Sequence, residues 1–352
     1  MGARSFIPIC AWKGFHRRTL WRGKHGMSQK VKSRRFKFPE ETSVIFALLV
    51  LVGIVGALRP TFLKPENLLN LAASYSISAL LAGCIVYLLS MGEIDLSFGW
   101  ILNLSAVVAG LSMIAGVPVW LGIILGICAG GFMGAINGVL TVVMRLPLII
   151  VTLGTASVFQ GISLISNKSG SVVPTEKKLT ENIFFRTLGG DIETPVPFIL
   201  IFVVFAFLVL HLTLHKTRFG YRILAIGSNP EAARLAGIPT KKIKILTCTL
   251  MGVVSGIGGI LFLGFRGAVD PSTGANLLLP VVAAAIIGGT PLSGGAGTVW
   301  GSLVGALIVG VIGVGIVFLG IDAVWSTLVT GLVIIFAIGV DQIVRVRKNR
   351  VS

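Results

Sequence analysis

Two acidic side chains stand alone in a long apolar part of this chain. Glu93 and Asp95 are the only acidic residues between Glu66 and Glu176. A charge at the centre of a bilayer costs on the order of 2.5–3.5 kcal/mol on insertion scales, so such a group usually has a function or lies at an interface. Two interpretations stay open. Asp95 or Ser97 caps a helix that begins just after them, or the surrounding turn is a break between helices whose backbone groups line a solute pathway.

A second set of polar residues has the chemistry of a short capped helix. Ser228 or Asn229 can accept hydrogen bonds from the first backbone N–H groups, and Pro230 suits the first helical position. Glu231 stands where the helix dipole favours negative charge. Gly237 can end the helix in a left-handed conformation. A connector between membrane spans needs only about two to eight residues. Two interpretations of this helix therefore stay open: a connector that lies on the surface, and a docking site for a soluble partner.

This segment resembles the cytoplasmic EAA loop of permeases from ABC importers, in which Glu-Ala-Ala is followed by Gly four residues after the last Ala. In that family the loop forms a coupling helix that sits in a groove of the ATPase subunit. The resemblance implies that the loop 215–244 docks a separate ATPase. The residues expected to make this contact are Asn229, Glu231, Ala232, Ala233 and Gly237.

Three further stretches are similar to the sugar-type branch of that family, the permeases for ribose, xylose and related compounds. Residues 92–99 resemble its G-G-I-D-L-S-V-G signature, and residues 288–301 resemble G-G-T-S-L-S-G-G-x-G-T-x-x-G. Residues 150–155 also resemble that branch. The resemblance covers about residues 43–341, and the departures from its signatures are Glu93 for Gly, Phe98 for Val and Pro291 for Ser.

The two glycine-rich signatures also resemble each other. Aligning Leu96-Ser97 with Leu292-Ser293 gives an offset of 196 residues. Each stretch follows an even-numbered apolar run, so both face the same side of the membrane. We therefore expect a parallel internal repeat, as in many transporters.

The resemblance implies the membrane-spanning subunit of an ATP-driven importer for a small sugar. Its partners would be two copies of an ATPase, a second permease that is identical or related, and an external binding protein. No G-x-x-x-x-G-K-[ST] motif occurs in the chain, so ATP and Mg would be bound by the partner ATPase and no cofactor by this chain. Sugars are neutral and rich in hydroxyl groups, which suits carboxylate and amide acceptors. We expect the pathway to include Asp95, Ser97, Asn103, Asn137, Gln160, Thr290 and Ser293.

Two other classes of function compete with this one. An ion-coupled secondary transporter would explain a repeat and intramembrane acids, but proton relays usually chain several ionisable groups. It would also leave the capped helix without a role. A membrane-embedded enzyme would need a catalytic cluster, yet the sequence contains neither H-E-x-x-H nor G-x-S-x-G. Its four histidines and four cysteines show no spacing suited to a metal site.

Composition identifies the elements that must position these residues. Of the 352 residues, 54% are hydrophobic and only 12% charged, whereas about a quarter are charged in soluble domains. Because each helical span needs about 20 mostly apolar residues, we predict an all-α, polytopic membrane protein with about ten spans. These lie near 43–58, 68–90, 98–115, 119–140, 147–166, 197–214, 245–265, 277–289, 298–318 and 321–340.

The positive charges indicate how these spans are oriented. With a cytoplasmic N-terminus, the inside segments are 1–42, 141–146, 215–244 and 341–352. They hold 23 of the 30 Lys and Arg residues, which is the positive-inside pattern. We therefore expect a multi-pass protein of the bacterial inner membrane with both termini, and the segment 215–244, in the cytoplasm.

The chain divides into a basic segment 1–42, a transmembrane domain 43–341 and a basic tail 342–352. Residues 1–39 contain eleven basic and no acidic residues. Three interpretations compete: an anchor on anionic lipid, a false upstream start with Met27 as the true initiator, and a mitochondrial transit peptide.

Glycines recur at every fourth residue through the fourth expected span. Small residues let helix backbones approach closely in lipid, where no hydrophobic force drives helices together. We therefore expect helix packing at Gly122, Gly126, Gly130, Gly134 and Gly138, and a similar seam at Gly297, Gly301 and Gly305.

Overall fold

The computed structural model describes residues 40–174, 179, 181–189, 196–322, 324–333, 335–336 and 339. All of them belong to one compact unit, Phe38–Ser352. Over these ranges the chain is helical and contains no strand, apart from an isolated antiparallel bridge between Val172 and Val269. Most of the expected segments 1–42 and 342–352 lie outside the described residues.

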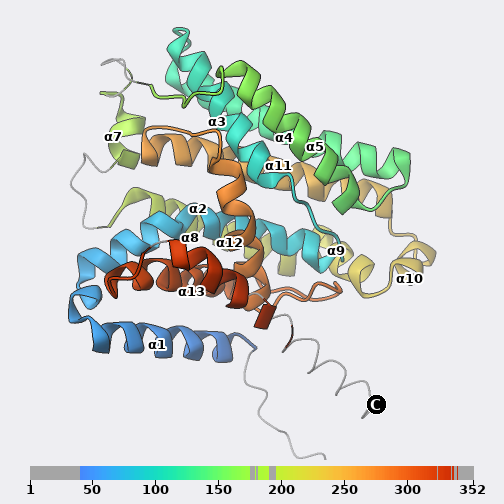
Figure 1. The fold of residues 1–352 in the computed structure, drawn as a ribbon. Helices are drawn as coiled ribbons and strands as arrows, with labels where there is room; N and C mark the ends of the chain where they lie inside the picture. The colour runs from blue at the N-terminus through green and yellow to red at the C-terminus, as the bar shows by residue number, and fades with distance from the viewer. Residues whose placement is uncertain are drawn as a thin grey trace, which may run out of the picture. The chain divides into compact units, whose positions relative to one another are not determined.

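The helices follow the apolar runs of the sequence (Figure 1). They are α1 (Glu40–Leu58), the 3-10 helix η1 (Pro60–Leu63), α2 (Pro65–Ser90), α3 (Phe98–Ile114), α4 (Val119–Met144), α5 (Leu148–Ser166), α7 (Ile183–Gly189), α8 (Phe198–Lys216), α9 (Arg218–Ser228), α10 (Pro230–Leu235), α11 (Thr240–Arg266), α12 (Thr273–Ile287) and α13 (Val299–Phe318).

Six of these helices are long and apolar enough to cross a membrane, namely α2, α4, α5, α8, α11 and α13. The other four expected spans coincide with shorter apolar helices at Thr42–Leu58, Phe98–Ile114, Thr273–Ile287 and Val324–Val333. A count of about ten spans is therefore not confirmed, because helices of this length do not by themselves cover the about 30 Å of a bilayer core.

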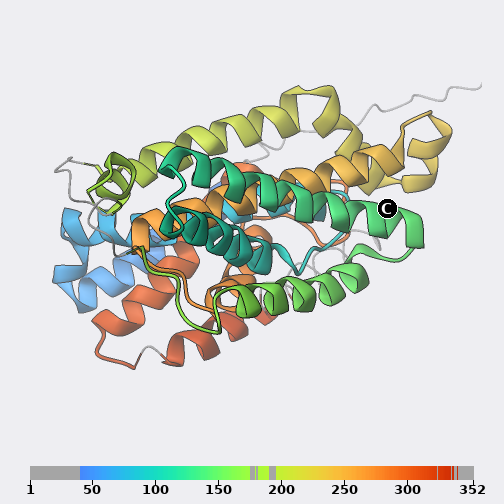
Figure 2. The same cartoon turned by 90° about the horizontal axis from the view of Figure 1, so that it is seen from above.

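The most extensive helix contact joins α4 and α11, which run side by side (Figures 1 and 2). A Cβ atom added to Gly130 would lie 2.5 Å from the Gly252 carbonyl oxygen, and one added to Gly134 would lie 2.8 Å from the Gly252 Cα. One added to Gly138 would lie 2.7 Å from the Ile245 Cα. At Gly126 the nearest backbone atom belongs to α3, and at Gly122 the nearest atom is in the Met113 side chain. All five glycines of the α4 stripe are buried.

The second glycine seam packs α13 against α12. Gly301 faces the backbone of Gly288, just after α12, and Gly305 faces the Ala284 carbonyl, so a side chain at either glycine would overlap backbone atoms. Gly297 precedes α13 and faces side chains of α2 instead, so it is not part of this seam. In Figure 1, α12 runs steeply across the direction of the neighbouring α2 and α13. At its other end, the backbone of Gly274 meets that of Gly99 at the start of α3.

The loops after α2 and α12 begin with the same backbone pattern. Gly92 and Gly289 have φ angles of +76° and +91°. In each loop the residue after this glycine donates a hydrogen bond back to the helix. The N–H of Glu93 donates to the Leu88 carbonyl at 2.9 Å, and the N–H of Thr290 donates to the Ala285 carbonyl at 3.1 Å. Both are helix C-terminal caps that need a left-handed glycine. The likeness is local, and a repeat over whole halves stays a prediction.

Candidate functional site

The candidate coupling helix is α10. Asn229 Oδ1 accepts the N–H of Ala232 at 3.0 Å, while the Ser228 hydroxyl donates to the Leu224 carbonyl instead. Asn229 is therefore the cap, and Gly237 follows the helix with φ +78°. Glu231 forms a 2.9 Å ion pair with Arg234, and both side chains are at least 70% exposed.

Ala233 is the residue by which α10 is anchored to the protein. It is 5% exposed and belongs to the main hydrophobic core, whereas Ala232 and Leu235 are exposed. One face of the expected motif therefore packs inward and the rest is open to a partner. Figure 2 shows α9 and α10 together at one end of the helices, which we call the α10 end.

The segment 215–244 holds more structure than the sequence predicted. Besides α10 it contains α9 and the start of α11. Ile223 and Ile226 of α9 are buried while Tyr221 is 71% exposed, so α9 is amphipathic. The spacing of these apolar residues indicates an amphipathic helix, but the sequence analysis did not predict α9.

The C-terminal end of α9 lies against the last residue of α2, which leads into the first signature loop (residues 92–99), and against the second signature loop (residues 288–301). The Ser90 carbonyl accepts the N–H of Gly295 at 2.8 Å, and the Ser90 hydroxyl donates to the Ala296 carbonyl at 3.1 Å. A Cβ at Gly227 would overlap the Ser90 oxygen and lie 2.6 Å from the Gly295 nitrogen. Three segments far apart in the sequence thus meet backbone to backbone, which leaves no room for them to shift independently.

Glu93 adds an ionic contact beside this meeting point. Its Oε1 pairs with Lys244 Nζ of α11, and its Oε2 accepts the N–H of Leu148 at the start of α5, at 3.2 Å. A carboxylate is favourable at a helix N-terminus. A cavity of about 350 Å³ lies here, and its lining includes Glu93, Lys244, Glu231 and Arg234. Nothing in the sequence identified Lys244 as the partner of Glu93.

Asp95, Ser97 and Asn137 form a fully buried polar cluster. Asp95 Oδ1 accepts two hydrogen bonds from Ser97, one from its N–H at 2.6 Å and one from its side-chain hydroxyl at 2.7 Å. The Asn137 amide donates to the Ser97 hydroxyl at 2.7 Å, and Thr152 accepts the N–H of Leu96 at 3.1 Å. Asp95 therefore holds the turn that begins α3. Among the described residues, Asp95 Oδ2 and Asn137 Oδ1 have no hydrogen-bond partner.

The remaining expected pathway residues lie elsewhere. Asn103 is buried and donates to the Asp270 carbonyl at 2.7 Å, while its Oδ1 accepts the Ser163 hydroxyl at 2.6 Å. It thus connects α3 to α5 and to the loop before α12. Thr290 is 1% exposed and accepts the N–H of Thr298 at 3.4 Å. Gln160 is half-buried and Ser293 is exposed.

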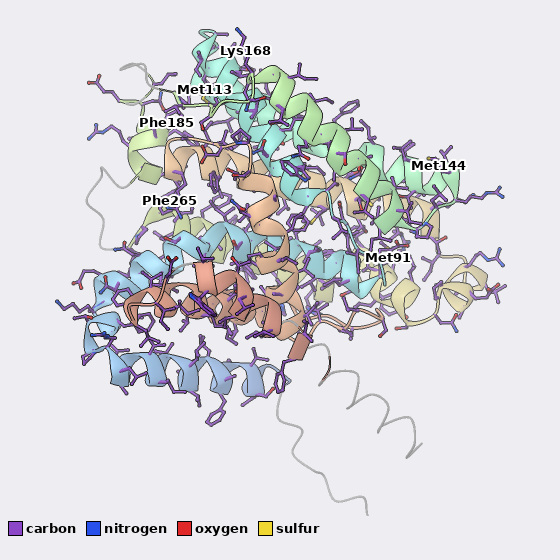
Figure 3. The ribbon with its side chains drawn as sticks, viewed as in Figure 1. Met91, Met113, Met144, Lys168, Phe185 and Phe265 are labelled. Carbon is purple, nitrogen blue, oxygen red and sulfur yellow. The ribbon has the colours of Figure 1, made fainter. Side chains whose placement is uncertain are left out.

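Figure 3 places these groups along the helices. Met91 and Met144 lie toward the α10 end, and Met113, Lys168 and Phe185 lie toward the opposite end. The α9–α10 unit, both signature loops and Glu93 therefore share one end with the loop between α4 and α5.

Comparisons with known proteins support a transport role for this arrangement. Residues 65–338 match the family model described as the permease component of the branched-chain amino acid transport system. The chain belongs to this permease family. It is similar to a ribose import permease of Bacillus subtilis (strain 168), with 37% identity over 84% of this chain and 90% of that protein. An L-arabinose ABC transporter permease of Azospirillum brasilense is 36% identical over 86% of this chain and 87% of its own length.

A D-allose transport system permease of Escherichia coli (strain K12) is 32% identical over 91% of this chain and 99% of that protein. No solved structure matches the chain. The permease is thus a transport component rather than an enzyme, and its long apolar helices make it a multi-pass membrane protein.

Proposed function

We propose that this permease imports a small neutral sugar and is driven by ATP hydrolysed on a separate ATPase that docks on α9 and α10. The names of the relatives, which refer to ribose, L-arabinose and D-allose, support the sugar. The observation that carries the coupling is the meeting of α9 with the end of α2 and with the second signature loop, at Ser90, Gly227 and Gly295.

In this proposal the ATPase moves α10, and two contacts pass the movement inward. One is the close backbone packing of Gly227 on Ser90 and Gly295. The other is the Glu93–Lys244 ion pair, because Lys244 lies in the helix that follows α10. ATP can drive the change only by binding the two conformations of the importer with different affinity.

The Asp95 cluster then acts as the closure of the sugar pathway toward the α10 end. Asp95, Ser97 and Asn137 are sealed from solvent in this conformation, and Thr290 and Ser293 lie in the second signature loop. Opening would expose the unpartnered oxygens of Asp95 and Asn137 to the sugar's hydroxyl groups. Asn103 and Gln160 would line the pathway further along α3 and α5. A second permease copy or a close relative would complete the pathway, and an external binding protein would deliver the sugar.

The same proposal places the permease in a bacterial inner membrane with both termini and α10 on the cytoplasmic side. The charge distribution of the sequence supports this orientation, because the inside segments carry most of the Lys and Arg residues.

Uptake by proteoliposomes tests the proposal. The permease would be reconstituted with its ATPase and binding protein, with ATP enclosed on the α10 side. We expect accumulation of labelled sugar that requires ATP and persists when ion gradients are collapsed. Uptake that follows a proton or sodium gradient without ATP would instead make the protein an ion-coupled secondary transporter.

A further inference from the structure

A second cavity, away from the coupling contacts, is lined by both polar and apolar residues. It has a volume of about 350 Å³ and lies between α2, α12, α13 and the helix Val324–Val333. It shares no lining residue with the cavity beside Glu93. Its described lining contains no Asp, Glu, Lys or Arg. The polar side chains come from three helices and are Tyr75, Asn276, Ser326, Thr327 and Thr330.

The glycines of α13 give Tyr75 its place at this cavity. A Cβ at Gly310 would lie 3.0 Å from the Tyr75 ring, and one at Gly313 would overlap the Tyr75 hydroxyl oxygen. Gly313 itself lines the cavity. The absence of side chains at these two positions therefore lets the phenol reach the cavity, where its hydroxyl can donate and accept hydrogen bonds.

Pro280 frees a backbone acceptor on α12. It lies inside the helix and lines the cavity together with Asn276. Because proline has no backbone N–H, it cannot donate to the carbonyl four residues earlier, which is that of Asn276. Asn276 thus offers a carbonyl oxygen in addition to its side-chain amide. Non-helical or unsatisfied backbone at membrane depth is tolerated where it lines a cavity.

The hydroxyl groups here differ from others on the same kind of helix. Ser76 of α2 donates to the Ala72 carbonyl at 2.8 Å, and Thr247 of α11 donates to the Ile243 carbonyl at 2.8 Å. Asn276 and Thr327 are exposed, the other three polar side chains of the cavity are half-buried, and none of the five makes a hydrogen bond to another described residue. Hydroxyl and amide groups that have no partner within the protein remain able to bind a ligand.

We propose that this cavity binds the transported sugar, through Tyr75, Asn276, Ser326, Thr327 and Thr330. The inference rests on the proposed function and adds its substrate contacts. Hydroxyl and amide groups both donate and accept, which matches the hydroxyl groups of a sugar, and the missing charge suits a neutral one. The volume lies within the about 300–1,000 Å³ typical of small-molecule sites. Tyr75 lies on the third turn of α2, counted from the end opposite α10, so the sugar meets this cavity before it reaches the Asp95 cluster.

Ala275 should set the size limit of the site, because it lines the cavity beside Asn276. Ala275→Leu would fill part of the volume. A purely structural residue would change the uptake of all sugars equally, whereas a site residue should discriminate between a five-carbon and a six-carbon sugar.

The test is uptake of labelled ribose, L-arabinose, galactose and allose by proteoliposomes that contain the full importer. Asn276→Leu and Thr327→Val should lower uptake about tenfold through lost hydrogen bonds, with ATP hydrolysis nearly unchanged because the ATPase docks elsewhere. Ala275→Leu should slow the two hexoses more than the two pentoses. Thr249→Val is the matched control, since Thr249 lies on α11 outside the cavity and bonds only to the Ile245 carbonyl.

Each result decides between the claims. If the wild-type importer takes up none of the four sugars with ATP, the proposed function fails and this inference fails with it. If the wild type works but the cavity variants behave like Thr249→Val, only the inference is overturned. If Asn276→Leu does not insert, it is replaced by Thr327→Cys in a background in which Cys10 and Cys128 are changed to serine, because Cys84 and Cys248 are buried. A water-soluble thiol reagent should then label Thr327→Cys more slowly in the presence of the sugar, and labelling that ignores the sugar would refute the site.

Discussion

Glu93 and Lys244 form an ion pair across 151 residues of sequence, joining the loop before α3 to the beginning of α11. The side chains are 18% and 25% exposed, respectively. The same carboxylate accepts the N–H of Leu148, so one side chain connects three elements at the α10 end. Asp95 is only two residues further on. A displacement of α11 therefore acts directly on the loop that holds the buried Asp95 cluster.

Breaking this pair should uncouple ATP hydrolysis from transport. Glu93→Gln and Lys244→Gln each leave one partly buried charge unpaired, which costs more than the pair contributes. We expect the number of sugars moved per ATP hydrolysed to fall by roughly tenfold, an effect that corresponds to about 1.4 kcal/mol. Uptake and phosphate release in proteoliposomes give this ratio.

The control for this experiment is Lys242→Gln, which removes an exposed charge two residues away. It should leave the ratio unchanged. The double variant Glu93→Lys/Lys244→Glu should recover part of the coupling, since the attraction is restored with opposite polarity. If all four variants moved as many sugars per ATP as the wild type, the ion pair would have no part in coupling.

Glu231→Arg should abolish uptake while leaving the amount of protein in the membrane unchanged. The side chain is 73% exposed and makes only a local ion pair with Arg234, so the fold does not depend on it. A reversed charge at a docking surface, however, repels the partner. Glu66→Arg, an exposed acid in the first turn of α2, is the matched control and should transport normally. Normal uptake by Glu231→Arg would exclude α10 as the docking site.

Asp95→Asn separates the two interpretations of that residue. Asparagine also accepts the hydrogen bonds that Asp95 Oδ1 receives from Ser97, so insertion and stability should be nearly normal. The carboxylate charge is lost, and with it a strong acceptor for sugar hydroxyl groups. We expect uptake to fall about tenfold, since hydrogen bonds to charged groups contribute about 1.5–3 kcal/mol. Normal uptake by Asp95→Asn would show that Asp95 only stabilises the start of α3 and does not contact the sugar.

Gly134→Ala should destabilise the helix packing. The added Cβ would lie 2.8 Å from the Gly252 Cα, and backbone cannot yield as a flexible side chain can. We expect a loss of about 1–3 kcal/mol, as for other overpacked sites, measured as a lower midpoint of thermal unfolding in detergent. Gly154→Ala on α5 has no atom within 4 Å of the added Cβ and should be neutral or stabilising by up to about 1 kcal/mol. Equal midpoints would mean that the α4–α11 seam can open freely.

Local chemistry made much of the helical structure predictable. The apolar runs located the helices, and the sequence Asn229-Pro230-Glu231 with Gly237 defined α10 because caps depend on neighbouring residues alone. The start of α3 was likewise expected near Asp95 and Ser97. The lengths of the helices were harder to predict from the sequence. The point at which α12 begins, for example, depends on the contact between Gly274 and Gly99, which are far apart in the sequence.

The site was predictable only in part, because its contacts are long-range. Asp95 and Asn137 were both named from their residue types, but their link through Ser97 depends on where α3 and α4 pack. The partner of Glu93 could not be chosen among the basic residues of the segment 215–244. The polar cavity at Tyr75 and Asn276 was missed because serine, threonine and tyrosine in apolar helices usually bond to their own backbone or pack, and sequence gives no sign of which ones do not.

The most direct test of ATP-driven import is to purify the permease from its native membrane in mild detergent and to identify the proteins that accompany it. We expect an ATPase subunit in stoichiometric amounts, and we expect it to be lost when Glu231 is replaced by Arg while Glu66→Arg retains it. Recovery of the permease without any ATPase, together with sugar transport in liposomes driven by an ion gradient alone, would contradict the account.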